Sequence, residues 1–491
     1  MSDIVAPAPV ARPRRLWLTL LVVLTAQLMI ILDSSAVNVA LPAIQHDLGV
    51  SQAGLTWVIN SYLISYGSFL LVAGRLGDLV GRKKVFLGGI ALFTVASAAC
   101  GLAGDQAVLV AARFVQGLGG ALASATVLAF IVTDFPQPLE RARAMSTYLL
   151  VTVSGGSLGL LLGGVLTQSL GWHWIFVINI PIGALALLAG AGLMSERPGT
   201  GLRRGVDVAG AVLVTAAALI GIDAIVQASQ HGWVSAYTLG LGALAVVLVG
   251  AFLVRESRTP NPLVPLRILR LRSLMGSSAV RGVLMAGMFG IFFFGALYLE
   301  QVLGYDGIHT GLAFLPQSFA VAVLSFGIAA RLVSRFGPMH VLVGGLIVMI
   351  SGLLLFARAA DGEHVHYFPT LFLSFVLVGL GAGVVFIPLL TMALAEVAPA
   401  DAGLASGIVN VSMQISAAVG LAALGTLATN RTASLLAEGR TQVAALAGGC
   451  RLGLLVGAGC VTFGLLLTVA VVRTPRIRRE PTGIPTEAVT P

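Results

Sequence analysis

Long apolar segments alternate with short polar or basic segments along the whole chain. Each apolar segment is close to the roughly 20 residues that an α-helix needs to cross a hydrocarbon core of about 30 Å. The pattern therefore predicts fourteen membrane-spanning helices. Their approximate ranges are 16–42, 54–74, 85–104, 107–133, 144–167, 175–194, 208–227, 237–254, 275–299, 310–330, 340–357, 367–390, 403–429 and 450–472.

Basic residues are concentrated in every second connecting segment. If the N-terminus is cytoplasmic, 23 of the 29 Lys and Arg residues fall in inner segments and four in outer ones. The remaining two, Arg113 and Arg281, lie inside predicted helices. This asymmetry predicts that both termini are cytoplasmic, because inner loops of membrane proteins are rich in Lys and Arg.

Composition supports an integral membrane protein. Hydrophobic residues make up 57% of the 491 residues and charged residues only 10%, which is too few to cover a soluble domain. In a soluble protein the net charge of +9 would suggest a nucleic-acid partner, whereas here the basic inner loops account for it. The first apolar segment is too long for a signal peptide, and the three cysteines form no metal or redox spacing.

An internal repeat predicts the domain organisation. Residues 73–82 and 329–338 share an R-L-x-x-x-x-G frame, and the two copies follow the second and tenth helices. Two equal halves of six helices, with two helices inserted between them, explain this offset of eight. We predict a tail at 1–15, a six-helix bundle at 16–194, the inserted pair with linkers at 195–272, a second bundle at 273–472 and a tail at 473–491. The fold class is an all-α membrane protein with two pseudo-symmetric bundles around a central cavity.

The first copy of the repeat carries fixed charges between glycines, on a predicted loop between the second and third helices. The glycines permit a tight turn and close helix approach. The acid can pair with a basic group or a helix N-terminus, and the arginines can bind neighbouring helix ends. The candidate residues are Gly74, Arg75, Gly77, Asp78, Gly81 and Arg82.

These residues resemble the signature loop of the major facilitator superfamily. Three further segments resemble its fourteen-helix drug:proton antiporter branch. They are L-D-S-S-A-V-N-V-A-L-P at 32–42, R-F-V-Q-G-L-G-G at 113–120 and G-G-S-L-G-L-L-L-G-G at 155–164. The last segment has Leu160 where that branch usually has proline.

The resemblance implies a proton-coupled exporter of drugs or antibiotics that works by alternating access. It would be a monomer in a bacterial plasma membrane, driven by the proton gradient without metal, cofactor or nucleic acid. Asp33 and Arg113 would couple protons, and Asn38, Gln116, Glu300 and Phe293 are candidates for the substrate pathway.

Asp33 and Arg113 also stand out on physical grounds. An aspartate inside an apolar helix is expected to pair, protonate or face water. Asp33 lies about 25 Å along its helix, and Arg113 lies near the outer start of another, so both are expected in the outer half of the membrane. A coupling role and a purely structural ion pair both remain open.

Other polar or small residues in the membrane have two readings. Gly155, Gly159, Gly163 and the adjacent Gly164 can form either a sliding surface between the two halves or static close packing. Arg281 is expected to extend to the nearby interface, and Asp223 to lie away from the central pathway. The Met- and Phe-rich residues 285–294 suit either a drug pocket or the core.

Two other functions compete with export. A symporter or facilitator importing a small nutrient would be expected to carry more embedded charge. A membrane enzyme would need a nucleophile–His–acid set, a phosphate loop or a metal site, and none of these patterns is present in the sequence. We therefore expect a transporter and not an enzyme.

Overall fold

The computed structural model describes residues 13–50, 52–196, 199, 207–259, 262, 264–324, 328–360, 366–394, 396–397 and 401–471. The predicted tails at 1–15 and 473–491 lie outside these residues, except that 13–15 already belong to the first helix.

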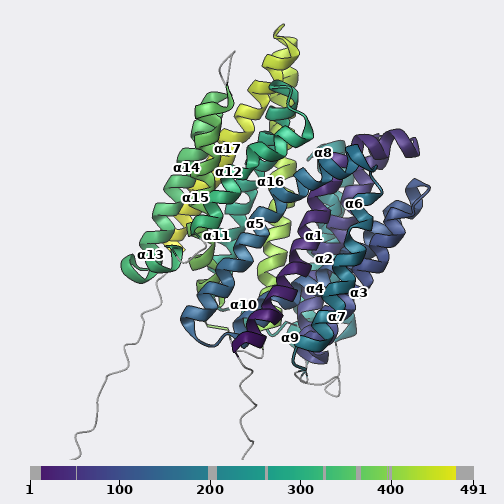
Figure 1. Cartoon of the computed structure of the whole chain (residues 1–491), viewed down its shortest axis with the longest axis vertical. Helices are drawn as coiled ribbons and strands as arrows, with labels where there is room; N and C mark the ends of the chain where they lie inside the picture. The colour runs from purple at the N-terminus through teal and green to yellow at the C-terminus, as the bar shows by residue number, and fades with distance from the viewer. Residues whose placement is uncertain are drawn as a thin grey trace, which may run out of the picture.

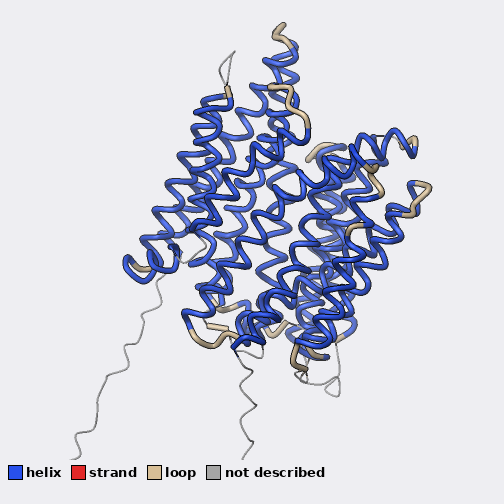
Figure 2. Tube along the Cα trace, viewed as in Figure 1, coloured by secondary structure: helices blue, strands red, loops and turns tan. Residues whose placement is uncertain are grey.

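Every regular element in the described residues is helical, as Figure 2 shows. The helices are α1 (Pro13–Leu48), α2 (Gln52–Val80), α3 (Arg82–Gly101), α4 (Gln106–Asp134), α5 (Pro138–Ser169), α6 (Trp174–Val177), α7 (Asn179–Leu193), α8 (Val208–His231), α9 (Ala236–Arg258), α10 (Leu266–Leu269), α11 (Arg272–Leu297), α12 (Gly307–Val323), α13 (Ala329–Phe336), α14 (Pro338–Ala359), α15 (Phe372–Leu394), α16 (Ala402–Ala437) and α17 (Gln442–Val471). Short π-helical segments, Tyr298–Val302 and Tyr367–Leu371, adjoin α11 and α15.

Thirteen helical spans in the described residues are long and apolar enough to cross a membrane. The one remaining predicted helix, at 310–330, corresponds to α12, which is apolar but has only 17 residues. Residues 325–327, directly after it, lie outside the described part. The prediction of an all-α membrane fold is confirmed.

The two halves of the chain repeat the same packing arrangement (Figure 1). In the first half α1 packs on α5 and α7, and α4 packs on α2 and α3. In the second half α11 packs on α16 and α17, and α15 packs on α12 and α14. Each of these four helix contacts in the first bundle thus has a counterpart in the second.

The two bundles meet along two seams. At one seam α5 packs on α12, and at the other α2 packs on α16. Helix α8, the first of the inserted pair, contacts both α2 and α16 and so covers the second seam. Helix α9 packs on α8 and exposes apolar side chains such as Val246 and Val247, which suits contact with lipid.

The repeated sequence motif folds into the same turn in both halves. Gly81 joins α2 to α3 with φ +113°, and Gly337 joins α13 to α14 with φ +81°. Residues with a Cβ rarely adopt such φ values, which explains the shared glycine. The predicted loop at 74–80 is wrong, because these residues form the last two turns of α2 and only Gly81 makes the turn.

Several helices are longer than their apolar segments. Helix α1 continues past Pro42 to Leu48, and α16 continues past the predicted end at residue 429 to include Arg431. Helix α17 begins at Gln442, eight residues before its predicted start. The 36 residues of α16 span about 54 Å, more than the thickness of a hydrocarbon core. Polar helix ends can extend beyond the bilayer, where water and neighbouring helix ends satisfy them.

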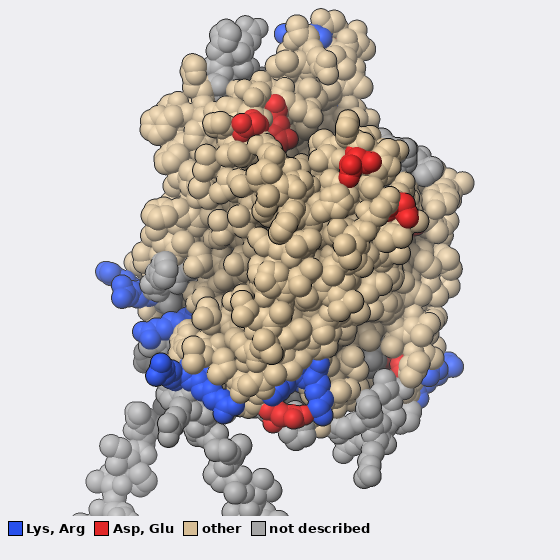
Figure 3. Space-filling model, turned by 45° about the vertical axis from the view of Figure 1, so that its right-hand side comes forward, with Lys and Arg blue, Asp and Glu red and all other residues tan. Residues whose placement is uncertain are grey.

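Charged side chains separate between the two ends of the molecule. On the face in Figure 3, Lys and Arg gather along the lower rim, the end at which Figure 1 places α10 and α13. Acidic side chains lie mainly nearer the upper end of this face. On this face, basic side chains therefore lie mainly at one end of the molecule.

The glycine face of α5 packs inside the first bundle, not between the bundles. A Cβ at Gly159 would lie 2.9 Å from the carbonyl oxygen of Leu32, and one at Gly163 would lie 2.7 Å from Cα of Ala36. Both partners belong to α1, so the reading of this face as a sliding surface between the halves is wrong. Gly155 also faces α1, whereas Gly164 approaches Gly307 at the start of α12.

We expect Gly159→Ala to destabilise the protein by about 1–3 kcal/mol, the usual cost of overpacking a close contact. The control is Gly156→Ala on the same helix, whose Cβ would make only ordinary contacts at 3.9 and 4.0 Å. Thermal unfolding in lipid nanodiscs measures both. Equal unfolding temperatures for the two variants would contradict the close approach of α1 and α5.

Candidate functional site

A buried polar network lies inside the first bundle, around Asp33 of α1. Helix α4 contributes Arg113 and Gln116, α3 contributes Ser97, and α7 contributes Asn179. All five side chains are buried, and each has at most 2% of its surface exposed. The pairing of Asp33 with Arg113, which their similar expected depths made possible, is present in the structure.

Each carboxylate oxygen of Asp33 has its own donors. Nη1 of Arg113 donates to Oδ2 at 2.6 Å. Nε2 of Gln116 and Nδ2 of Asn179 both donate to Oδ1 at 2.8 Å. Three donors from two other helices therefore hold the anionic form of Asp33.

Ser97 connects the amides of this network to the backbone. Its Oγ accepts hydrogen bonds from Gln116 Nε2 at 3.0 Å and Asn179 Nδ2 at 2.9 Å, and donates to the carbonyl of Phe176 at 3.0 Å. Phe176 and Asn179 flank the break between α6 and α7. Pro181 has no N–H to continue the helical ladder, which favours a break at this point.

The guanidinium of Arg113 is held on three sides. Nε donates to the carbonyl of Val58 at 3.3 Å, and Nη1 also donates to Gln116 Oε1 at 2.8 Å. The Tyr62 ring lies 4.1 Å from Cζ, close enough for a cation–π interaction. Removing one partner of such a buried pair typically costs about 3–5 kcal/mol, because a buried charge is left uncompensated.

The other predicted pathway residues do not join this network. Asn38 is exposed and its amide donates to carbonyls of its own helix. Glu300 is exposed in the π-helical segment after α11. Phe293 is 44% exposed, while the neighbouring Phe292 stacks on Phe314 at 5.5 Å.

Sequence reasoning missed Ser97, Asn179 and Tyr62 as members of the site. Asn179 follows a tryptophan-rich segment and precedes Pro181, so an amide beside a helix break was the available signal. Ser97 and Tyr62 gave no comparable signal, because serine and tyrosine are ordinary residues in membrane helices.

A second polar cluster joins the bundles near the basic end of the molecule. Oδ2 of Asp78, at the end of α2, accepts a hydrogen bond from the backbone N–H of Leu404 at 3.1 Å, in the first turn of α16. Its Oδ1 accepts from Arg82 at 3.0 Å. Arg82 also donates to Thr133 Oγ1 at 2.7 Å, near the end of α4. Both pairings predicted for Asp78 are found, and we call this cluster the Asp78 latch.

Contacts near the Asp78 latch join each bundle to the linker between α9 and α11. Arg75 donates weakly to the carbonyl of Pro262 at 3.5 Å in the linker after α9. Arg267 of α10 pairs with Asp401, the residue before α16, at 2.8 Å. Gly74 and Gly77 are buried within the last turns of α2.

Two further intramembrane charges lie outside both clusters. Arg281 is only 3% exposed, so the expectation that it extends to the interface is wrong. Asp223 of α8 is half-buried, one helical turn from Gln227.

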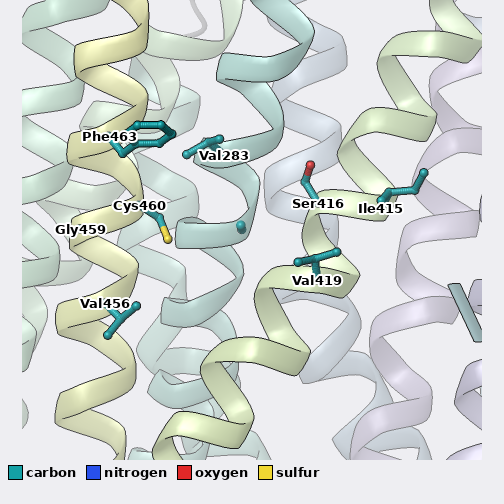
Figure 4. Close-up of a pocket in the computed structure, with 9 residues that line it drawn as sticks. Val283, Ile415, Ser416, Val419, Val456, Gly459, Cys460 and Phe463 are labelled. Carbon is teal, nitrogen blue, oxygen red and sulfur yellow. The ribbon is translucent and has the colours of Figure 1, made fainter. Parts of the chain in front are cut away.

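The Met- and Phe-rich residues belong mostly to the core. Met288, Ile291 and Phe294 are buried in the second bundle. An open groove of about 510 Å³ lies instead between α11, α16 and α17 (Figure 4). Figure 4 shows Val283, Val419 and Phe463 among its mainly apolar lining, and the exposure of Phe463 indicates a lipid-facing groove.

The sequence profile of the Major Facilitator Superfamily matches residues 23–421 and 310–482. The puromycin resistance protein of Streptomyces alboniger is 38% identical over 94% of this chain and 91% of its own length. The tetracenomycin C resistance and export protein of Streptomyces glaucescens is 34% identical over 86% of this chain and 78% of its own.

Solved structures agree on the fold. The proton:xylose symporter XylE superposes with a TM-score of 0.64 over 94% of this chain and 96% of the symporter. The two sequences are 14% identical, so this likeness concerns the fold alone.

Proposed function

The chain belongs to the major facilitator superfamily and is a multi-pass membrane transporter, and on this premise we propose that it exports hydrophobic or amphipathic small molecules, such as drugs or antibiotics, in exchange for protons. The export direction is supported by relatives that are named for antibiotic resistance and export.

The observation that carries proton coupling is the fully buried Asp33–Arg113 pair. A proton on Asp33 removes the negative charge that Arg113 faces and replaces an acceptor with a donor. Gln116 and Asn179 also aim donors at the carboxylate, so protonation forces these side chains to rearrange. Proton binding then biases the equilibrium between two arrangements of the helices, because it interacts differently with each.

The Asp78 latch supplies the element that separates these two arrangements. It ties α2 of the first bundle to α16 of the second at the basic end. Opening that end requires the carboxylate of Asp78 to leave the N-terminus of α16. We place this end in the cytoplasm, where basic residues are expected, together with both termini.

The remaining predictions complete the proposal. The chain works as a monomer in the bacterial plasma membrane, with bundles at 16–194 and 273–472 and the inserted pair at 195–272. Lipids, protons and the exported compound are its partners, and it needs no cofactor. The alternative function is import of a small nutrient by a symporter or facilitator.

Transport into inverted membrane vesicles tests the proposal. An acidic lumen is imposed, and accumulation of ethidium and puromycin is followed over time, with empty-membrane vesicles as the control. Accumulation that collapses when the pH gradient is dissipated supports antiport. Equilibration of a nutrient, with no compound moving against its gradient, would indicate nutrient import instead of export.

A further inference from the structure

We propose that Arg281 is an anion-binding group between the two bundles, and that the compounds carried include amphipathic molecules with an acidic group. This inference rests on the proposed transport function and adds a chemical class of substrate to it. It concerns a place separate from the Asp33 network, because Arg281 belongs to α11 of the second bundle.

Arg281 lies well inside the membrane-spanning part of α11. It follows Arg272, the first residue of α11, by nine residues, or about 14 Å of helix. Only 3% of its surface is exposed, so the guanidinium does not reach the interface. A charge held at this depth requires compensation or carries a cost of several kcal/mol.

An anionic partner is present for Arg113 and absent for Arg281 among the described residues. Arg113 pairs with Asp33 at 2.6 Å. Nε and Nη1 of Arg281 are buried without a hydrogen-bond partner in the described part of the chain. No described carboxylate forms an ion pair with Arg281.

The face of α11 that carries Arg281 presents several unused donors. Ser277 and Ser278 lie four and three residues earlier, on the same side of the helix. Both are at most 3% exposed, and their hydroxyls likewise lack partners in the described residues. One guanidinium and two hydroxyls thus lie on one side of α11 without a hydrogen-bond acceptor among the described residues, an arrangement that suits a carboxylate or a similar anion.

The surroundings of Arg281 place this donor face between the bundles. Tyr148 of α5, in the first bundle, lies near Arg281. The Phe386 ring of α15 lies 5.5 Å from Cζ of Arg281. Val283, which lines the lipid-facing groove, points to the opposite side of α11, because two residues turn a helix by about 200°.

A ligand at this point therefore contacts a cation, hydroxyls and aromatic rings. An amphipathic anion satisfies the donors and places its apolar body against Phe386 and Tyr148. A cationic drug would be repelled by Arg281, and a neutral one would leave its charge uncompensated. The donor set thus selects for acids at this site.

Two related dyes test the assignment. Fluorescein is a xanthene with a carboxylate, and rhodamine 123 is a cationic xanthene ester of similar size. Binding is measured by fluorescence anisotropy with the full chain in phosphatidylcholine nanodiscs. We expect Arg281→Gln to weaken fluorescein binding by about 10- to 100-fold, the range typical of hydrogen bonds to a charged group. Rhodamine 123 binding should not weaken, because the variant removes a charge that repels the cation.

Two further variants control for charge and geometry. Arg281→Lys keeps the charge and should retain part of the fluorescein affinity. Arg331→Gln removes one positive charge from an exposed position on α13 and should leave both dyes unaffected. A fall in fluorescein affinity for Arg331→Gln equal to that for Arg281→Gln would indicate general attraction and overturn the site.

Stability of the unaltered protein gives an independent readout. Fluorescein should raise its unfolding temperature more than rhodamine 123 does, even if Arg281→Gln fails to fold. Absence of fluorescein binding to the unaltered protein, or equal binding to Arg281→Gln, would overturn the proposal. Loss of dye binding in discs that contain phosphatidylglycerol would assign the site to a lipid headgroup and also overturn it.

These outcomes are separable from those for the proposed function. If fluorescein binding depends on Arg281 but no pH-driven transport is seen, the anion site is supported and antiport is contradicted. Uphill transport of ethidium without fluorescein binding would support antiport and remove the anion site.

Discussion

Replacing Asp33 with Asn is expected to reduce pH-driven uptake into inverted vesicles by at least about 100-fold. The variant cannot lose or gain the proton, and its amide nitrogen would face one of the donors Arg113, Gln116 or Asn179. It also leaves the Arg113 charge uncompensated, at a cost of about 3–5 kcal/mol, and a loss of that size corresponds to more than 100-fold in an equilibrium.

The measurement compares uphill accumulation with downhill exchange of the same compound. Downhill exchange should persist, because it needs no proton movement. Asp223→Asn is the matched control, since this carboxylate lies in α8, outside the network, and its replacement should leave uphill transport intact. Full uphill transport by Asp33→Asn would exclude Asp33 as the coupling residue.

Asp78→Asn is expected to lower transport by about tenfold and to open the basic end of the molecule. The substitution removes the negative charge from the N-terminus of α16 and from the ion pair with Arg82. A charge at a helix N-terminus contributes about 0.3–1 kcal/mol and up to about 2 in partly buried positions. Together with the lost ion pair, this is enough to shift a two-state equilibrium about tenfold.

Double electron–electron resonance spectroscopy between two spin labels measures this shift directly. Lys84→Cys in α3 and Arg272→Cys in α11 place labels on exposed positions of the two bundles, after Cys100, Cys450 and Cys460 have been replaced by Ala. Asp78→Asn should add a longer distance to the distribution. Glu438→Gln, an exposed acid after α16, should not. An unchanged distribution in Asp78→Asn would show that the latch does not hold the bundles together.

Apolar length and basic residues were sufficient to predict the fold. Fourteen segments could be counted because a bilayer requires long apolar runs, and the internal repeat predicts where two further helices are inserted. The ends of the helices were less predictable. Gly74 and Gly77 are typical of loops, but α2 contains both, and a helical glycine costs only about 1 kcal/mol, which packing can offset.

A residue's part in the site could be predicted when it depended only on the depth of that residue in the membrane. Asp33 and Arg113 share a depth, and opposite charges in a membrane interior seek each other. Orientation around the helix was not predictable for Arg281, since a position near a helix start suits an interfacial side chain and a buried one equally. The role of Asn179 depends on the break before α7, which brings the amide to the carboxylate.

Helix α5 bears two close contacts on different sides. Gly159 and Gly163 hold it against α1, the helix that carries Asp33, and Ser157 bonds to Ser318 of α12 at 2.8 Å in the other bundle. Backbones in such contact leave no space to absorb a displacement of even an ångström. If a proton on Asp33 shifts α1, as proposed above, α5 would therefore transmit the shift to α12 of the second bundle, although Arg113, Gln116 and Asn179, which bind Asp33, all belong to the first bundle.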